Sequence, residues 1–126
     1  MSKRAVTSPD LTPPVGPFSQ AIEVGGFIFF SGQVGQDPTT GKLVAGGVGA
    51  ETERIFQNLA AVLKAAGKGF DDVVRAGLYL TSISDYAVVN GIYARHFSQP
   101  FPARTAIGVA ALPLGACVEI DLVVKA

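Results

Sequence analysis

The sequence has very few of the side chains that bind metals or cross-link a chain. Its 126 residues include one histidine, His96, one cysteine, Cys117, and no tryptophan. A single cysteine cannot form an intramolecular disulfide, and the two side chains together provide too few nitrogen and sulfur ligands for a zinc site within one chain. We therefore expect no metal centre and a reducing, cytoplasmic environment.

The sequence also lacks an excess of charge of either sign and any long hydrophobic run. Ten basic and ten acidic residues give a net charge of zero, so the overall charge offers no attraction to nucleic acid or to an anionic membrane. The longest apolar runs, such as FIFF and LAAVL, are too short to span a bilayer. The first residues, MSKRAVTSPD, do not resemble a secretory leader. We expect a soluble protein without a membrane or nucleic-acid partner.

Apolar side chains, in contrast, are abundant. Hydrophobic residues make up 48% of the chain and charged residues only 16%. The length suits one domain, residues 1–126, and a domain of this size has a large surface for its volume. The apolar excess therefore predicts that part of the surface is buried against other copies, in a homo-oligomer.

Turn residues and apolar spacing predict the first half of the fold. Gly25 and Gly26 separate FSQAIEV from FIFFSG, as in a two-residue β-hairpin turn. Apolar residues at helical spacing predict a helix over 50–67 that ends at Gly67.

The second half contains four further predicted elements, a strand, a helix and then two strands. A strand is predicted over 72–82, with four apolar residues on its core face: Val74, Ala76, Leu78 and Leu80. A second helix is predicted over 84–97, ending before Pro100. Residues 103–111 and 117–125, joined by LPLGA, predict a second hairpin. The order β-β-α-β-α-β-β indicates an α+β fold with both helices on one face of a mixed sheet.

Familiar catalytic motifs do not match. AGGVGAET precedes a helix but has neither a dinucleotide-binding nor a P-loop spacing. Ser31 lacks the glycine that a nucleophile elbow needs two residues earlier, and is better placed to donate a hydrogen bond. His96 lies near a predicted helix end, where interaction with the helix dipole is its ordinary role. Cys117 is ordinarily explained as a small packed side chain.

Two charged residues in apolar surroundings remain as candidates. Arg104, in PFPARTAIGV, is always charged and needs water or an anionic partner. Glu119, in CVEIDLVV, alternates with the apolar face of its strand together with Asp121. If oligomerisation covers that outer face, the pKa of such a carboxyl rises, as in a general base. Solvent exposure or an intersubunit ion pair is the alternative explanation for both.

Four stretches together resemble the Rid family, the YjgF-type reactive-intermediate deaminases. They are GPFSQAIEVGGFIFFSGQVGQDPTTGKL, NLAAVLKAAG, DVVRAGLYLTSISDYAVVNGIYARHF and PARTAIGVAALPLGACVEIDLV. The last is the most specific, with P-A-R, a short apolar strand, L-P and then a glutamate between apolar residues. The resemblance implies a chorismate-mutase-like homotrimer with three intersubunit clefts. It also implies an activity like that of 2-iminobutanoate/2-iminopropanoate deaminase, which hydrolyses 2-imino or enamino acids to 2-oxo acids and ammonia without a cofactor.

The resemblance also implies roles for individual residues. Arg104 would hold the substrate carboxylate with its planar fork, and Glu119 would position and activate water. Ser31 and the backbone at Gly32 would line the cleft, and Asn90 matches a helix position near the site.

Two positions depart from the family pattern. Phe18 stands where the family motif G-P-Y-S-Q has a tyrosine, so a hydroxyl that would orient substrate is missing. Ala106 stands where many members carry a cysteine, which excludes thiol-based regulation there.

Two other functions remain open at this point. Similar proteins have been described as translation-inhibiting endoribonucleases and as chaperone-like, and a trimer that binds a small carboxylate without turning it over is a further alternative. Neutral charge and the lack of a Lys/Arg-rich face argue against RNA.

The predicted final hairpin also suggests which subunit supplies which residue. In that hairpin Glu119 faces Val109 and lies on the order of 16 Å from Arg104, at about 3.3 Å per residue. We therefore expect each cleft to take Arg104 from one subunit and Glu119 from its neighbour.

Overall fold

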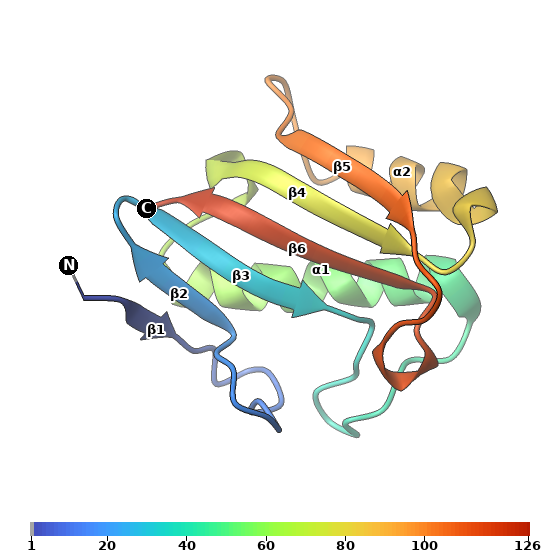
Figure 1. Cartoon of the computed structure of the whole chain (residues 1–126), viewed down its shortest axis with the longest axis horizontal. Helices are drawn as coiled ribbons and strands as arrows, with labels where there is room; N and C mark the ends of the chain where they lie inside the picture. Colours follow the sequence, from blue (N-terminus) through green and yellow to red (C-terminus); the bar gives the residue numbers. More distant parts are fainter. Residues whose placement is uncertain (1) are drawn as a thin grey trace.

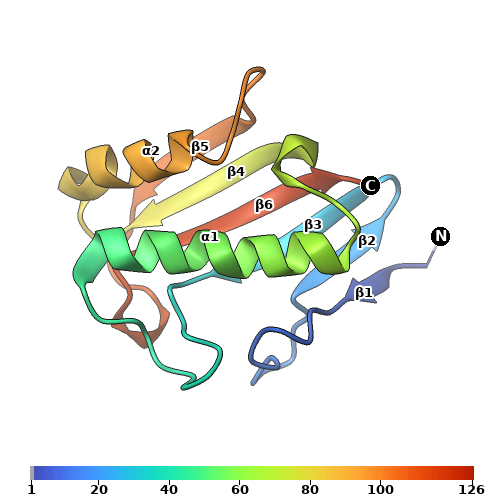
Figure 2. The ribbon, with the colours of Figure 1, turned by 180° about the vertical axis from the view of Figure 1, so that it is seen from behind.

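The computed structural model describes residues 2–126, which form one six-stranded mixed sheet with two α-helices on one of its faces (Figures 1 and 2). The strands are β1 (Arg4–Val6), β2 (Ala21–Val24), β3 (Phe27–Gln33), β4 (Val73–Leu80), β5 (Ala103–Gly108) and β6 (Val118–Lys125). The helices are α1 (Gly47–Ala65) and α2 (Tyr86–Ala94), with 3-10 turns at Phe70–Asp72, Ile83–Asp85 and Pro113–Gly115. The α+β fold with both helices on one face is confirmed, and β1 is an edge strand that the sequence did not predict.

The predicted first hairpin is confirmed. β2 and β3 pair antiparallel around Gly25 and Gly26, whose φ angles of 62° and 85° lie in the left-handed region. Residues without a Cβ adopt these angles without strain. Gly67, with φ 72°, follows the end of α1 as predicted.

The core lies between the sheet and the two helices. α1 buries the apolar stripe that the sequence predicted, at Ile55, Phe56, Leu59, Val62 and Leu63. α2 adds Val89 and Tyr93, and Phe97 follows it. The sheet contributes alternate residues, including all four apolar residues at the even positions of β6: Val118, Ile120, Leu122 and Val124.

α2 begins at Tyr86, two residues later than predicted. A 3-10 turn precedes it, and the Ser82 and Ser84 hydroxyls form a hydrogen bond with each other instead of capping the helix.

One residue of β4 was assigned to the wrong face. Val74 is exposed, while Val73 is buried in the core. The pairing with β6 shifts by one residue between Val73 and Arg75, so Val74 is the extra residue of a β-bulge. A bulge interrupts the strict alternation on which the prediction depended, whereas Ala76, Leu78 and Leu80 are buried as expected.

The predicted second hairpin is wrong. The sheet order is β1-β2-β3-β6-β4-β5, so β6 lies between β3 and β4, and β5 pairs parallel with β4 at the sheet edge (Figure 1). Two apolar strands joined by a short loop are consistent with a hairpin, but here the 3-10 turn Pro113–Gly115 carries the chain past β4 instead. Leu114 in that turn has φ 60°, the only described non-glycine residue with a positive φ. β6 pairs with β3 along one edge and with β4 along the other. It is therefore a central strand, which is consistent with the burial of its apolar residues.

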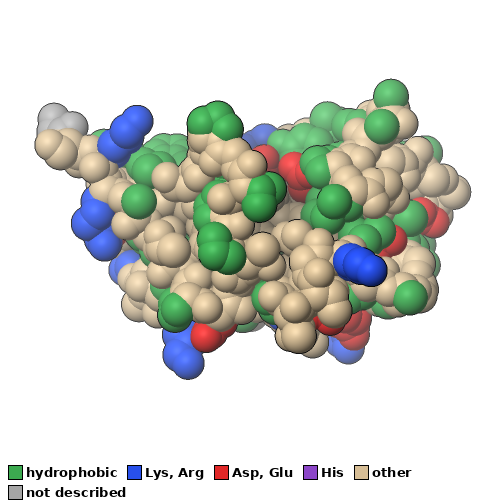
Figure 3. All heavy atoms as spheres, turned by 90° about the horizontal axis from the view of Figure 1, so that it is seen from below, with side chains coloured by type: hydrophobic (Ala, Val, Ile, Leu, Met, Phe, Trp, Pro, Cys, Tyr) green, Lys and Arg blue, Asp and Glu red, His purple; other side chains and the backbone are tan. Residues whose placement is uncertain are grey.

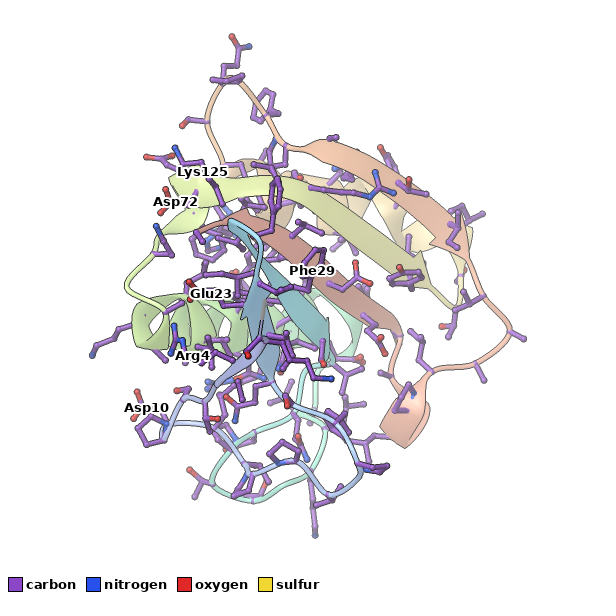
Figure 4. The ribbon with its side chains drawn as sticks, turned by 60° about the vertical axis from the view of Figure 1, so that its left-hand side comes forward. Arg4, Asp10, Glu23, Phe29, Asp72 and Lys125 are labelled. Carbon is purple, nitrogen blue, oxygen red and sulfur yellow. The ribbon has the colours of Figure 1, made fainter. Side chains whose placement is uncertain are left out.

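The second face of the sheet carries no helix in the described part of the chain (Figures 1 and 2). Phe29, which alternates with the buried Ile28 and Phe30, stands on this open face and is 47% exposed (Figure 4). Phe27 and Ile107 are also large, apolar and exposed there. Figure 4 also shows Arg4 of β1 beside Glu23 of β2, with which it forms an ion pair.

Candidate functional site

Arg104 lies on β5, opposite Ala76 of β4, and its side chain points to the helix side of the sheet. Its Nη1 donates a hydrogen bond of 2.7 Å to Asn90 Oδ1, and its Nη2 donates to the Tyr86 hydroxyl. The guanidinium carbon is 4.7 Å from the centre of the Tyr93 ring. These three α2 residues are spaced i, i+4 and i+7, which places them on one face of the helix. α2 therefore orients the guanidinium from one side.

The described partners of Arg104 are all neutral. Ion pairs within residues 2–126 join Arg4 to Glu23 and Arg95 to Glu53, and none includes Arg104. Arg104 is half-buried and lines a cavity of about 420 Å³ with five other residues: Asn90, Tyr93, Ala94, Phe101 and Pro102. A guanidinium has five N–H donors, so donors remain for a ligand after the bonds to α2. This side of the protein can bind a carboxylate.

Glu119 lies on β6, opposite Tyr79 of β4, and points to the open face. It lines a second cavity, of about 310 Å³, formed by the Pro-rich segment before β2, the end of β3, the following loop and the 3-10 turn before β6. Glu119 is the only charged side chain among the sixteen residues that line this cavity. Seen from the edge where these loops lie, hydrophobic side chains gather in several places on the surface (Figure 3).

The carboxyl of Glu119 lies directly over Gly32. A Cβ at residue 32 would be 2.1 Å from Glu119 Oε2, so any other residue there would displace the carboxyl. Burial raises the pKa of Glu119 above its usual range, and the negative charge of Asp121 raises it further. No described side chain donates a hydrogen bond to this carboxyl. A carboxyl whose pKa is raised in this way is a stronger proton acceptor than one in water.

Buried hydrogen bonds hold the walls of the Glu119 cavity. Gln20 Oε1 accepts a 2.6 Å bond from the Ser8 N–H, and the Ser31 hydroxyl donates a 2.6 Å bond to the Ser19 carbonyl. The Ser31 hydroxyl thus donates within the chain and ties β3 to the segment before β2, while a hydrogen bond from Ser31 to substrate stays a prediction. Phe18 lines the cavity and is 55% exposed.

The start of β6 is held by a buried acid of α1. The carboxylate of Glu51 is buried and accepts a 2.8 Å bond from the Cys117 N–H, two residues before Glu119. The Cys117 thiol also lies within hydrogen-bond reach of the Glu51 carboxyl, and this contact, together with burial and nearby negative charge, raises the pKa of the thiol, which does not suit a nucleophile. Gly35 allows the close approach of the loop to α1, since a Cβ there would lie 2.8 Å from Glu51 Cα.

The predicted site residues fall into two groups in one chain. Arg104 and Asn90 line the cavity on the helix side, and Ala106 shares their side of β5 without lining it. Phe18, Gly32 and Glu119 line the other cavity, with Ser31 next to it.

The two groups do not meet, because Arg104 and Glu119 point to opposite faces of the sheet. β4 separates their strands, so they are about 10 Å apart across the sheet and, by register, about 10 Å along it.

Some residues at these sites were not predicted. Tyr86 and Tyr93 contact Arg104, and their helical spacing with Asn90 was a visible signal. Tyr79 and Asp121, which lie beside Glu119, could not be recognised without knowing that β4 and β6 are neighbours.

Other titratable groups do not form a site. His96 stacks on Phe56 with ring centres 4.1 Å apart and ring planes inclined by 2°, and burial lowers the pKa of its imidazole.

Within residues 2–126 no three His, Cys, Asp or Glu side chains gather closely enough to hold a metal ion. No described helix is both long and apolar enough to cross a membrane.

Comparison with known proteins connects this geometry to a family. Residues 10–126 match the family model described as endoribonuclease L-PSP. The human 2-iminobutanoate/2-iminopropanoate deaminase is 43% identical over 121 residues, which cover 96% of this chain and 88% of the human protein. Protein DfrA of Myxococcus xanthus is 44% identical over 125 residues, covering 98% of this chain and 95% of DfrA.

Solved structures of Rid proteins have the same fold as this chain. The Rid protein YyfA of Yersinia pestis superposes with a TM-score of 0.95 at 36% identity and covers 99% of this chain and 100% of its own. RidA from an Antarctic Psychrobacter species superposes with a TM-score of 0.90 at 42% identity. The match covers 98% of this chain and 100% of the Psychrobacter chain. With a family match over most of its length, deaminase relatives and the same fold, the chain belongs to the Rid family.

Proposed function

We propose that this protein hydrolyses 2-imino acids and their enamino tautomers to 2-oxo acids and ammonia in the cytoplasm. Several curated relatives between 38% and 47% identical are named 2-iminobutanoate/2-iminopropanoate deaminase. The observation that carries the proposal is Arg104, a half-buried cation whose described partners are all neutral. A substrate carboxylate would supply the missing negative charge.

The reaction needs a bound carboxylate, a water molecule and a base. Arg104 would hold the carboxylate and so place the C=N carbon next to the water. Glu119 would take a proton from that water as its oxygen attacks the carbon, and would pass this proton to the imine nitrogen. Glu119 would then move the hydroxyl proton of the resulting carbinolamine to the amino nitrogen, so that the C–N bond breaks, ammonia leaves and the C=O bond forms. The overall balance is imine plus water to ketone plus ammonia.

Both residues must act on one small molecule, and this requires two copies of the chain. Arg104 and Glu119 point to opposite faces of one sheet, so a single chain presents two half-sites. The open face with Phe27, Phe29 and Ile107 supplies an apolar surface for self-association. We propose a homotrimer whose clefts each combine Arg104 of one subunit with Glu119 of the next. The hairpin that first suggested this was wrong, but the opposite orientations support the same arrangement more directly.

The proposal is tested with freshly generated substrates. An amino-acid oxidase or a dehydratase produces a panel of 2-imino acids, and their decay and the release of ammonia are followed with and without the protein. We expect acceleration by the wild type and little by Arg104→Lys, because an ammonium keeps the charge without the two-pronged geometry. Arg95→Lys, which changes an exposed arginine, is the matched control and should keep full activity.

An RNA-directed activity is a second candidate because the family model is described as endoribonuclease L-PSP and some similar solved structures are titled putative endoribonuclease. Wild-type imine decay equal to the uncatalysed rate would overturn the proposed function. RNA cleavage that persists in Arg104→Ala would favour the endoribonuclease, and carboxylate binding without turnover would favour a binding protein.

A further inference from the structure

A hydrogen-bonded pair on the open face lies next to Glu119. In the pairing of β4 with β6, Tyr79 is directly opposite Glu119, and Gly77 is directly opposite Asp121. The Tyr79 hydroxyl nevertheless donates a 2.9 Å hydrogen bond to Asp121 Oδ2, on the diagonal, and not to its direct neighbour Glu119. The one described hydroxyl that faces Glu119 across the strands is thereby occupied.

Gly77 makes this diagonal pairing possible. A Cβ at residue 77 would lie 2.3 Å from Asp121 Oδ1 and 2.9 Å from the Tyr79 hydroxyl oxygen. Gly32 plays the corresponding part for Glu119, whose carboxyl lies over it. Two glycines, on the strands that flank β6 on either side, therefore give the two carboxyl groups of β6 separate places on one sheet face.

We propose that the Tyr79–Asp121 pair is a positioning device for Glu119. By holding the Tyr79 hydroxyl over Gly77, Asp121 keeps Glu119 without a competing hydrogen bond and available to accept a proton from water. This inference rests on the proposed function, in which Glu119 is the base. Neither Tyr79 nor Asp121 lines the cavity, so both act through Glu119.

The charges around Glu119 are consistent with this device. Asp121 faces it from its own strand, Tyr79 from β4 and Gly32 from β3, and the cavity walls present no other titratable side chain. The hydrogen bond to Asp121 is the main cause that raises the pKa of Tyr79, with smaller contributions from burial and from nearby charges. Tyr79 therefore remains a neutral donor at physiological pH. If it turned to Glu119 it would stabilise the carboxylate and weaken it as a base.

Three variants separate the charge of Asp121 from its hydrogen bond. Asp121→Asn removes the charge but can still accept from Tyr79. Asp121→Ala removes both and frees the hydroxyl to turn to Glu119. Tyr79→Phe/Asp121→Ala removes the hydroxyl as well. The pKa of Glu119 is measured in each by NMR of carboxyl-labelled glutamate, assigned with Glu119→Gln, and the pH profile of kcat/KM is measured in parallel.

We expect the pKa of Glu119 to fall in Asp121→Asn, to fall further in Asp121→Ala, and to return in the double variant to the Asp121→Asn value. In Asp121→Ala, kcat at neutral pH should decrease about tenfold, the effect of one hydrogen bond to a charged group, with KM unchanged. The acid limb of the pH profile should move to lower pH in the same order. Melting temperatures provide the control for folding.

Equal pKa values of Glu119 in Asp121→Ala and Asp121→Asn would overturn the proposal, because they would mean that the hydroxyl does not turn to Glu119. An unchanged pKa in all three variants would overturn it too. The NMR measurement needs no turnover, so it tests the device even if the wild type hydrolyses no imine. Failure of the device and failure of the proposed function are therefore distinguishable.

Discussion

The helix side and the open side of the sheet present opposite charges in different settings. On the helix side, α2 holds the Arg104 guanidinium with an amide, a hydroxyl and an aromatic ring. On the open side, Glu119 lies over a glycine and receives no hydrogen bond from a described side chain. Neutral partners orient the cation, and burial raises the pKa of the acid; the proposed carboxylate clamp and proton acceptor depend on these two settings.

The largest expected effect comes from removing the base. Glu119→Gln keeps the shape of the side chain but cannot accept a proton, and loss of a general base costs about 10² to 10⁴-fold. We expect kcat for imine hydrolysis to fall on that scale while the affinity for a non-reacting 2-oxo acid, measured by calorimetry, changes little. Glu53→Gln, at an exposed ion pair, is the control. A Glu119→Gln enzyme with wild-type kcat would remove Glu119 from the mechanism.

The next largest effect concerns the clamp. Arg104→Lys should raise KM and lower kcat/KM for imine hydrolysis about 100-fold, because one ammonium cannot replace two parallel N–H donors or the stacking on Tyr93. In contrast to Glu119→Gln, the affinity for the 2-oxo acid should fall as well. Equal affinities for the 2-oxo acid in the variant and the wild type would show that Arg104 does not bind the carboxylate.

The two half-sites can also be recombined. The Arg104→Ala and Glu119→Ala proteins are mixed, unfolded and refolded together, and mixed trimers of the proposed assembly are verified by mass spectrometry. If each cleft takes one residue from each of two subunits, roughly one quarter of the clefts in a random mixture carry both wild-type residues. We expect activity to recover to about that fraction. Verified mixed trimers without activity would mean that both residues act within one chain.

A smaller effect is expected at the cavity wall. Phe18→Tyr restores the hydroxyl of the family motif at an exposed position, so the fold should be unchanged. We expect the ratio of kcat/KM values across the imine panel to change a few-fold, the scale of a single neutral hydrogen bond. Identical ratios would assign the position to packing alone.

The smallest expected effect is on stability. The pKa of Glu119 is higher in the folded chain than its unfolded value near 4.5, so between these two pKa values the folded state binds more protons. Stability should therefore decrease as pH rises through that window. The urea midpoint of the wild type, relative to that of Glu119→Gln, should fall over this range, and a parallel pH dependence in the two proteins would contradict the shifted pKa.

Local signals predicted most of the elements. Gly25 and Gly26 require positive φ angles, and α1 shows a continuous apolar stripe that ends at Gly67. Each of these features depends on residues close together in the chain. The alternation in β6 likewise predicted that Glu119 points away from the core. The bulge at Val74 was missed, because an extra residue in a strand depends on the partner strand.

The sequence by itself determined every strand except β1, both helices, the face on which Glu119 lies and the family to which the chain belongs, because local periodicity and motif spacing carry that information. Only the tertiary structure decided the order of the strands, since pairing partners are chosen by packing between distant segments. The placement of β6 between β3 and β4 puts Tyr79 beside Glu119 and Gly32 beneath it. The parallel edge position of β5 turns Arg104 toward α2. No local pattern specifies either contact, because each one joins residues far apart in the chain.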